Sequence, residues 1–175
     1  VGTVGVLVIA SERGLCGAFN TVVLQVAERY LAEQEALGHH ILLITLGQRA
    51  TTHFERRGRP PVWSEHLPMT TVASLAAVQR LHRRLVRAYD AGRFDLLHAI
   101  YTPYRLRAPL EPIARQILPT ELSPPEEPPA WPPPIIDADP QVVYRQIEKQ
   151  WSLIELYRCI IESAASEQAA RFQVL

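Results

Sequence analysis

Residue types and spacing that could support binding or catalysis occur in residues 4–21, which read VGVLVIASERGLCGAFNT. An apolar run of strand type ends at Ile9, three polar residues follow, and the turn GLCG occupies residues 14–17. Asn20 and Thr21 then begin an amphipathic helix. Proteins often bind phosphate groups where a glycine-rich turn joins a strand to the N-terminus of a helix. The segment therefore raises a nucleotide site as a first hypothesis.

The glycine spacing of this turn does not support a nucleotide site. A dinucleotide-binding turn has the spacing G-x-G-x-x-G, and a P-loop has the spacing G-x-x-x-x-G-K-[ST]. Gly14 and Gly17 fit neither pattern, and the only lysine of the chain is the distant Lys149. We therefore interpret the segment as a tight strand-to-helix turn in which glycine permits positive φ or close backbone packing. A phosphate cradle at the helix N-terminus stays open as the alternative.

The two cysteines, Cys16 and Cys159, are far apart and lack the C-x-x-C spacing of a metal or redox site. We expect free thiols in a reducing compartment. A thiolate is favoured at a helix N-terminus, so a nucleophilic Cys16 is an alternative to a packed or exposed thiol. The sequence holds no Ser-His-Asp pattern and no H-E-x-x-H motif. It therefore predicts no catalytic residue, no metal site and no cofactor.

Length and charge limit the possible functions. The chain of 175 residues is long enough for one domain with a sizeable core, since 47% of its residues are apolar. Its formal net charge is zero, whereas nucleic-acid binding usually needs a basic excess. The sequence has no apolar run of membrane-spanning length and no signal peptide. It begins in a strand and stops within a helical pattern, so we expect that both ends are either cut or disordered.

Residues 1–118 alternate between strand and helix patterns, which predicts an α/β domain with a Rossmann-like, mixed but mostly parallel sheet and flanking helices. A helix carrying Arg80, Arg83, Arg84 and Arg87 on its polar face belongs to this region. We interpret this arginine row as a solvated face, with a docking surface for an acidic partner as the alternative. The expected elements are strands at 4–9, 41–46, 61–63 and 94–101, helices at 21–37, 47–57 and from Thr70 or Thr71 to Asp90, and a bent edge strand within 105–118.

A proline-rich connector, residues 119–139, follows this domain. Its run SPPEEPPAWPPP is incompatible with a helix or a central strand, so we expect an extended, polyproline-like spacer. Such a segment also binds SH3-type or WW-type modules, which makes an adaptor protein one alternative function. We expect Trp131 to anchor the connector against the domain.

A long C-terminal helix is predicted over residues 140–175, with Asp139 as N-cap and Pro140 in the first turn. An apolar stripe with steps of four and seven suits a partner helix, as in half of an antiparallel coiled coil. We expect part of this helix to project beyond the domain and the isolated chain to self-associate through it. The stripe comprises Val143, Ile147, Ile154, Ile161 and Ala165.

Two motifs in this order, SERGLCGAFNT and YRCIIESAASEQAARF, resemble the gamma subunit of F-type ATP synthases, the central rotor stalk. Segments between them, including GQRATTHFERRG and AYDAGRFD, are also similar to that family, so the resemblance covers nearly the whole chain. The residues that match the motifs, and that the resemblance implies as partner-interface residues, are Ser11, Arg13, Gly14, Leu15, Cys16, Gly17, Asn20, Glu162, Ser163, Ser166, Glu167 and Arg171.

Four residues depart from the pattern of this family. Glu12 stands where the family usually has Asp, Ala18 where it has a second Gly, Gln168 where it often has His, and Phe172 where it often has Met. Family members also carry an N-terminal helix before the first strand and a longer C-terminal helix. These two helices form the coiled coil, and we expect the given chain to be a piece without the first and without most of the second.

The resemblance implies a rotor subunit without catalytic residues of its own. Such a subunit couples rotation of a proton- or sodium-driven ring to ATP synthesis or hydrolysis in the catalytic hexamer. Its implied partners are the alpha and beta subunits, the epsilon subunit and the membrane c-ring, with no nucleic acid. It is expected as a peripheral membrane protein on the cytoplasmic face of a bacterial or organellar-type energy-coupling membrane. A Rossmann-like nucleotide-binding enzyme and a proline-rich adaptor remain the alternatives.

Overall fold

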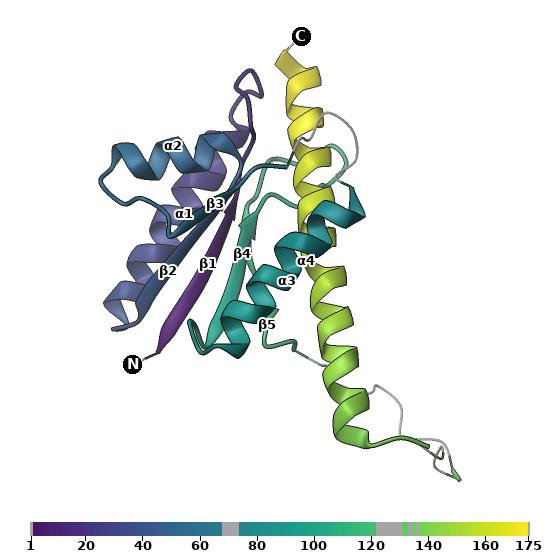
Figure 1. The fold of residues 1–175 in the computed structure, drawn as a ribbon. Helices are drawn as coiled ribbons and strands as arrows, with labels where there is room; N and C mark the ends of the chain where they lie inside the picture. Colours follow the sequence, from purple (N-terminus) through teal and green to yellow (C-terminus); the bar gives the residue numbers. More distant parts are fainter. Residues whose placement is uncertain (1, 68–73, 122–130, 133–134, 136, 175) are drawn as a thin grey trace.

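A five-stranded sheet with helices on both faces organises the chain (Figure 1). The computed structural model describes residues 2–67, 74–121, 131–132, 135 and 137–174. Its elements in chain order are β1 (Thr3–Ile9), α1 (Phe19–Ala36), β2 (His40–Leu46), α2 (Gln48–Arg56), β3 (Trp63–Glu65), α3 (Leu75–Asp90), β4 (Leu96–Tyr101), β5 (Ile113–Leu118) and α4 (Pro140–Val174).

The strand order is β3-β2-β1-β4-β5. β1 pairs in parallel with both β2 and β4, and β3 pairs in parallel with β2. Only β5 runs antiparallel, against β4. The order therefore reverses between β1 and β4, as in doubly wound folds. The prediction of a Rossmann-like, mixed but mostly parallel sheet is confirmed.

Alternate residues of β1 point into two separate cores. Val6 and Val8 pack with apolar residues of α1 and α2 on one face of the sheet. Leu7 and Ile9 pack with residues of α3 and α4 on the other face. A strand that is buried on both faces needs apolar residues at every position, which explains the continuous apolar run in the sequence.

α4 is one uninterrupted helix of 35 residues, about 50 Å long (Figure 1). Its first turn is capped as predicted, because the Oδ1 atom of Asp139 accepts a 2.9 Å hydrogen bond from the backbone N–H of Gln141. Leu156, Cys159 and Ile160 join the core on the α3 side of the sheet. The predicted stripe lies away from this core, and Ile147 and Ile154 on it are exposed. None of the described helices is both long enough and apolar enough to cross a membrane.

Several element boundaries differ from the prediction. α1 begins at Phe19 rather than Thr21, because the N–H of Phe19 bonds the carbonyl of Cys16 and continues the turn into the helix. β3 is residues 63–65 rather than 61–63, since two prolines precede it and proline has no N–H to donate. β4 begins at Leu96 rather than residue 94. β5 is confined to 113–118, because residues 105–112 form a loop in which Arg107 has φ of 57°.

Two further expectations concern chain segments that the structure describes only in part. The described N-cap of α3 is Ser74, whose Oγ accepts a hydrogen bond from the N–H of Ala77, while Thr70 and Thr71 lie outside the described residues. Most of the proline run, on which the adaptor hypothesis depends, also lies outside them. The anchoring role expected for Trp131 is wrong. Its side chain is 90% exposed, and an indole anchors a segment only where an apolar recess covers its ring.

Candidate functional site

The loop that follows β1 is closed on itself by the side chain of Asn20. The backbone N–H of Ser11 donates a 3.0 Å hydrogen bond to Asn20 Oδ1. Asn20 Nδ2 donates to Ser11 Oγ at 2.7 Å and to Cys16 Sγ at 3.1 Å. Ser11 and Cys16 are buried. One amide side chain at the start of α1 thus fixes both ends of the turn.

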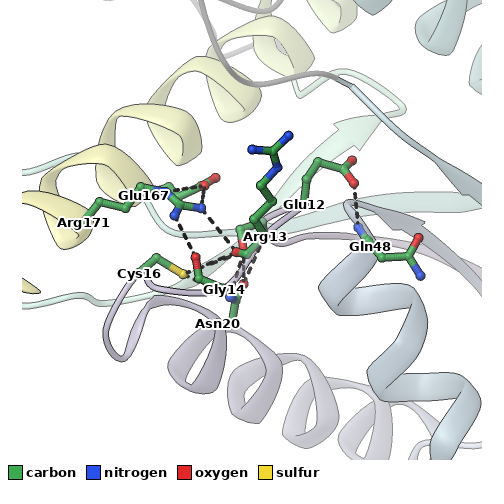
Figure 2. Close-up of polar contacts among 9 residues, drawn as sticks. Glu12, Arg13, Gly14, Cys16, Asn20, Gln48, Glu167 and Arg171 are labelled. Atoms are coloured by element: carbon green, nitrogen blue, oxygen red, sulfur yellow. Dashed lines mark hydrogen bonds and ion pairs between the residues drawn. The ribbon is translucent and has the colours of Figure 1, made fainter.

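A second set of contacts joins this loop to the last turns of α4 (Figure 2). The guanidinium of Arg171 donates to two backbone carbonyls of the loop, from Nη1 to Gly14 O at 2.7 Å and from Nη2 to Arg13 O at 3.2 Å. Glu167 Oε1 accepts from Arg171 Nη2 at 2.6 Å and from Arg171 Nε at 3.1 Å. Glu167 is only 4% exposed. We call this group the clasp: Arg13, Gly14, Glu167 and Arg171.

The glycines of the loop serve close packing. A Cβ atom on Gly17, where φ is +54°, would lie 3.3 Å from Val174 Cγ2 of α4. A Cβ atom on Gly14 would meet only the movable end of the Arg49 side chain, so the close packing is at Gly17. Leu15 between them also has positive φ, and its side chain is 86% exposed. The interpretation of the segment as a tight turn is confirmed, and the turn presents one apolar side chain to solvent.

Glu12 links the loop to α2. Its Oε2 accepts a 3.1 Å hydrogen bond from the N–H of Gln48, the first residue of α2, and lies 3.2 Å from His66 Nδ1. A carboxylate at a helix N-terminus is stabilised by the helix dipole. In the sequence, Glu12 was notable only as a departure from the first gamma-subunit motif. Nothing local in the sequence indicates this cap, because its partner lies 36 residues away.

A further polar group joins the end of β4 to α4. Tyr101 Oη donates a 3.1 Å hydrogen bond to Glu162 Oε2, and Arg158 Nε donates to Glu162 Oε1 at 2.8 Å. Burial raises the pKa of Tyr101, so its phenol stays protonated and keeps donating. Burial likewise raises the pKa of the neighbouring Cys159 thiol to about 12, which leaves that thiol unreactive at neutral pH.

Comparison with known proteins decides the family. A sequence profile described as ATP synthase matches residues 1–175. The chain belongs to the ATP synthase gamma-chain family. The gamma chain of Chloroflexus aurantiacus is 28% identical over 171 residues, covering 98% of this chain and 58% of the relative. The gamma chain of Rippkaea orientalis is 30% identical over 119 residues, covering 68% of this chain and 38% of the relative. The chain therefore spans less than two thirds of these gamma chains.

Solved structures of the same fold agree with this gamma-family membership. A chain in the central stalk and c-ring structure of the Tetrahymena thermophila mitochondrial ATP synthase gives a TM-score of 0.72 at 16% identity. The match covers 98% of this chain and 74% of that one. A chain in the rotor structure of the Euglena gracilis mitochondrial ATP synthase gives a TM-score of 0.68 at 16% identity, with 99% and 65% coverage. At this identity the likeness establishes the fold.

The structure brings the two gamma motifs together and sorts their residues by accessibility. Both motifs contribute to the clasp, and a small apolar cluster of Cys16, Phe19 and Ala170, with Leu110 beside it, packs next to them. Sequence reasoning missed Phe19 and Leu110, since neither has a local signal for this contact. Of the residues expected at a partner interface, Arg13, Leu15 and Gly17 are exposed, Gly14, Asn20, Glu162 and Arg171 are half-buried, and Ser11, Cys16, Ser163, Ser166 and Glu167 are buried.

The clasp occupies the place where a doubly wound fold usually binds its ligand. Ligands of such folds lie outside the carboxyl ends of the strands where the strand order reverses, here beyond β1 and β4. In this gamma chain Arg171 contacts the loop after β1, and Glu162 contacts the last residue of β4. The loop offers carbonyl acceptors to a guanidinium, whereas a phosphate needs N–H donors. Among the described residues no three His, Cys, Asp or Glu side chains form a metal-binding group. This arrangement suits mechanical attachment of a helix.

Proposed function

We propose that this gamma chain is a central-stalk subunit of an F-type ATP synthase and that it works as a rigid rotor. It couples rotation of an ion-driven membrane ring to ATP synthesis or hydrolysis in the catalytic hexamer. The observation that carries this proposal is the continuity of α4, a 35-residue helix attached to the sheet domain in its middle by the core and near its end by the clasp. A shaft transmits torque only if it does not turn independently of its body.

The proposal assigns parts to the chain. Residues 1–118 form the body, residues 119–139 connect, and residues 140–175 form part of the shaft. The partners are the alpha and beta subunits, the epsilon subunit and the c-ring. The chain supplies no catalytic residue, and the complex lies at the cytoplasmic face of a bacterial or organellar-type membrane. The exposed stripe of α4, with Ile147 and Ile154, supports a helical partner.

Within the two motifs, accessibility separates two roles. We assign contact with neighbouring subunits to Arg13, Leu15 and Gly17, which are exposed on the loop. Arg171 and Glu167 hold that loop in place from the inside. Leu15 supports this assignment, because it combines positive φ with an exposed apolar side chain. Such a strained residue is explained if a partner covers its side chain.

Single-molecule rotation tests the rotor proposal. Both native cysteines are buried, so a Leu37→Cys variant at the exposed end of α1 can be labelled selectively. The labelled variant, expressed from the whole native gene, is assembled with the alpha and beta subunits of the same organism. The catalytic hexamer is then fixed to a surface. We expect the label to rotate in one direction when ATP is added and to stop with a non-hydrolysable analogue. Assembled complexes that hydrolyse ATP while the label stays still would contradict the proposal.

A further inference from the structure

The polar face of α3 carries an unusual concentration of positive charge. Arg80, Arg83, Arg84 and Arg87 are all exposed, and the only acidic residue of this helix is Asp90 at its C-terminal end. Like charges three or four positions apart repel one another on a helix, and an acidic residue is unfavourable at a helix C-terminus. The gamma chain has no net charge, so this surface is a local excess.

Most of this charge is not neutralised within the part of the chain that the structure describes. Arg84 donates a 2.6 Å hydrogen bond to Glu65 Oε1, and its guanidinium lies 4.7 Å from the centre of the Trp63 ring. No described carboxylate lies within ion-pair distance of Arg80, Arg83 or Arg87. The row therefore consists of three arginines with solvated guanidinium groups and a fourth, Arg84, whose guanidinium contacts other residues of the domain.

A groove of about 380 Å³ runs beside this row, between α3 and α4. Arg83 and Arg87 line one wall, and Lys149 of α4 lines the other, 4.0 Å from Asp90. Val86 and Leu153 give the groove an apolar part. Asp90 also lines the groove and pairs with Lys149, so the unneutralised positive charge comes from the arginines of α3 beside the apolar part.

We propose that this surface, which we call the arginine groove, docks an acidic amphipathic segment of a partner protein. Its carboxylates pair with Arg80, Arg83 and Arg87, and its apolar side chains cover the accessible part of Leu153. Guanidinium groups favour carboxylates because the two planar groups can form paired hydrogen bonds. This inference is independent of the rotor proposal, because it concerns a face of the domain that the clasp and the exposed stripe do not use.

The spacing of the charges favours a polypeptide over a phosphate group. Arg80 and Arg87 are seven positions apart, which corresponds to about 10 Å along the helix. A single phosphate needs donors that converge on one point, whereas these side chains form a line. A partner helix with carboxylates at positions i, i+4 and i+7 matches such a line, and its apolar face can enter the groove.

A peptide titration of the gamma chain tests this inference. The probe is a fluorescent peptide of about 15 residues, long enough to form a helix, with Glu at i, i+4 and i+7 and Leu beside them. Its control has Gln at each Glu position. The protein variants are R80Q/R83Q/R87Q and the matched R29Q/R49Q/R56Q, which removes the same charge from exposed arginines elsewhere. Binding is followed by anisotropy, and melting curves check that both variants fold.

We expect the acidic peptide to bind, the Gln peptide to bind much more weakly, and affinity to fall as salt is added. R80Q/R83Q/R87Q should weaken binding by about tenfold or more, and R29Q/R49Q/R56Q by less than about twofold. Equal losses in the two variants, or equal binding of the two peptides, would overturn the inference. It is also overturned if inorganic phosphate or phosphatidylglycerol vesicles bind through these arginines while the acidic peptide does not.

Discussion

Among single residues, Arg171 carries the attachment between the loop after β1 and α4. Truncation by Arg171→Ala removes two hydrogen bonds to loop carbonyls and leaves the nearly buried Glu167 carboxylate without its cation. An uncompensated buried charge is costly, so we expect a loss of about 2–4 kcal/mol in the free energy of unfolding, measured with urea. Arg158→Ala is the control, because its pair with Glu162 also lies on α4 but Arg158 is more exposed. A loss below about 1 kcal/mol is expected there, and equal losses would refute a special role for Arg171.

Gly47 is the second residue that local packing makes irreplaceable. It has φ of 98°, and a Cβ atom there would lie 2.2 Å from the carbonyl oxygen of Ala10, which is backbone and cannot move aside. We expect Gly47→Ala to lower the melting temperature far more than Gly38→Ala. Gly38 also has positive φ, but nothing lies within 4 Å of its Cβ position, so only the backbone strain of about 1 kcal/mol remains. Similar melting temperatures for the two variants would contradict this packing argument.

The two motifs of the candidate site could be predicted from the sequence, but their contact could not. The GLCG turn was recognisable from its glycines and from the strand and helix around it. The bond between Arg171 and Gly14 joins residues 157 positions apart, and no periodicity encodes such a pairing. The same reason hides the cap that Glu12 provides for α2. Local signals specify a turn or a helix, whereas the contacts of the site depend on how α4 crosses the sheet.

At the level of elements, the contact between α3 and α4 contains a buried histidine that makes stability depend on pH. Burial, and then the charge of Lys149, lowers the pKa of His82 to about 4. His82 Nε2 donates a 2.8 Å hydrogen bond to Ser152 Oγ, which in turn donates to the carbonyl of Lys149. In an unfolded chain the pKa of histidine is about 6.5. Between these values the unfolded state binds a proton that the folded state does not.

The free energy of unfolding should therefore fall as pH is lowered from about 6.5 to about 4. Above that window His82 is neutral in both states, so it no longer makes the free energy of unfolding depend on pH. His82→Gln keeps a polar partner for Ser152 but does not titrate. We expect its stability to fall less steeply than that of the parent over the same window, as measured by urea denaturation at several pH values. Carboxylates titrate equally in both proteins, so parallel curves would show that His82 is not the group responsible.

Elements with a strong pattern were predicted well, and elements fixed by their neighbours were not. The span of β1 follows from its continuous apolar residues, and the span of α4 follows from the absence of helix breakers. β3 has only three residues and pairs with the end of β2, so its position depends on that pairing rather than on its own sequence. Residues 105–112 alternate weakly, and their loop lies against the end of α4, where Leu110 packs near Ala170.

At the scale of the whole molecule, α4 has two apolar faces, of which only one is buried. One face is buried by the sheet and α3, and the other leaves several large side chains in solvent. A buried aliphatic side chain contributes about 1.5–3 kcal/mol, so these residues favour association when no partner is present. The exposed large apolar residues of this second face, on the first half of the helix, are Tyr144, Ile147, Trp151 and Ile154.

We expect the chain alone to self-associate through this exposed face of α4 as its concentration rises, detected by light scattering over a dilution series. Ile147→Gln/Ile154→Gln should shift the association midpoint to at least about tenfold higher concentration, because it removes two half-exposed aliphatic side chains from the contact. Leu37→Gln is the control, since Leu37 is also exposed but lies at the end of α1. A monomer at all concentrations, or an equal shift in the control, would show that the face is not adhesive.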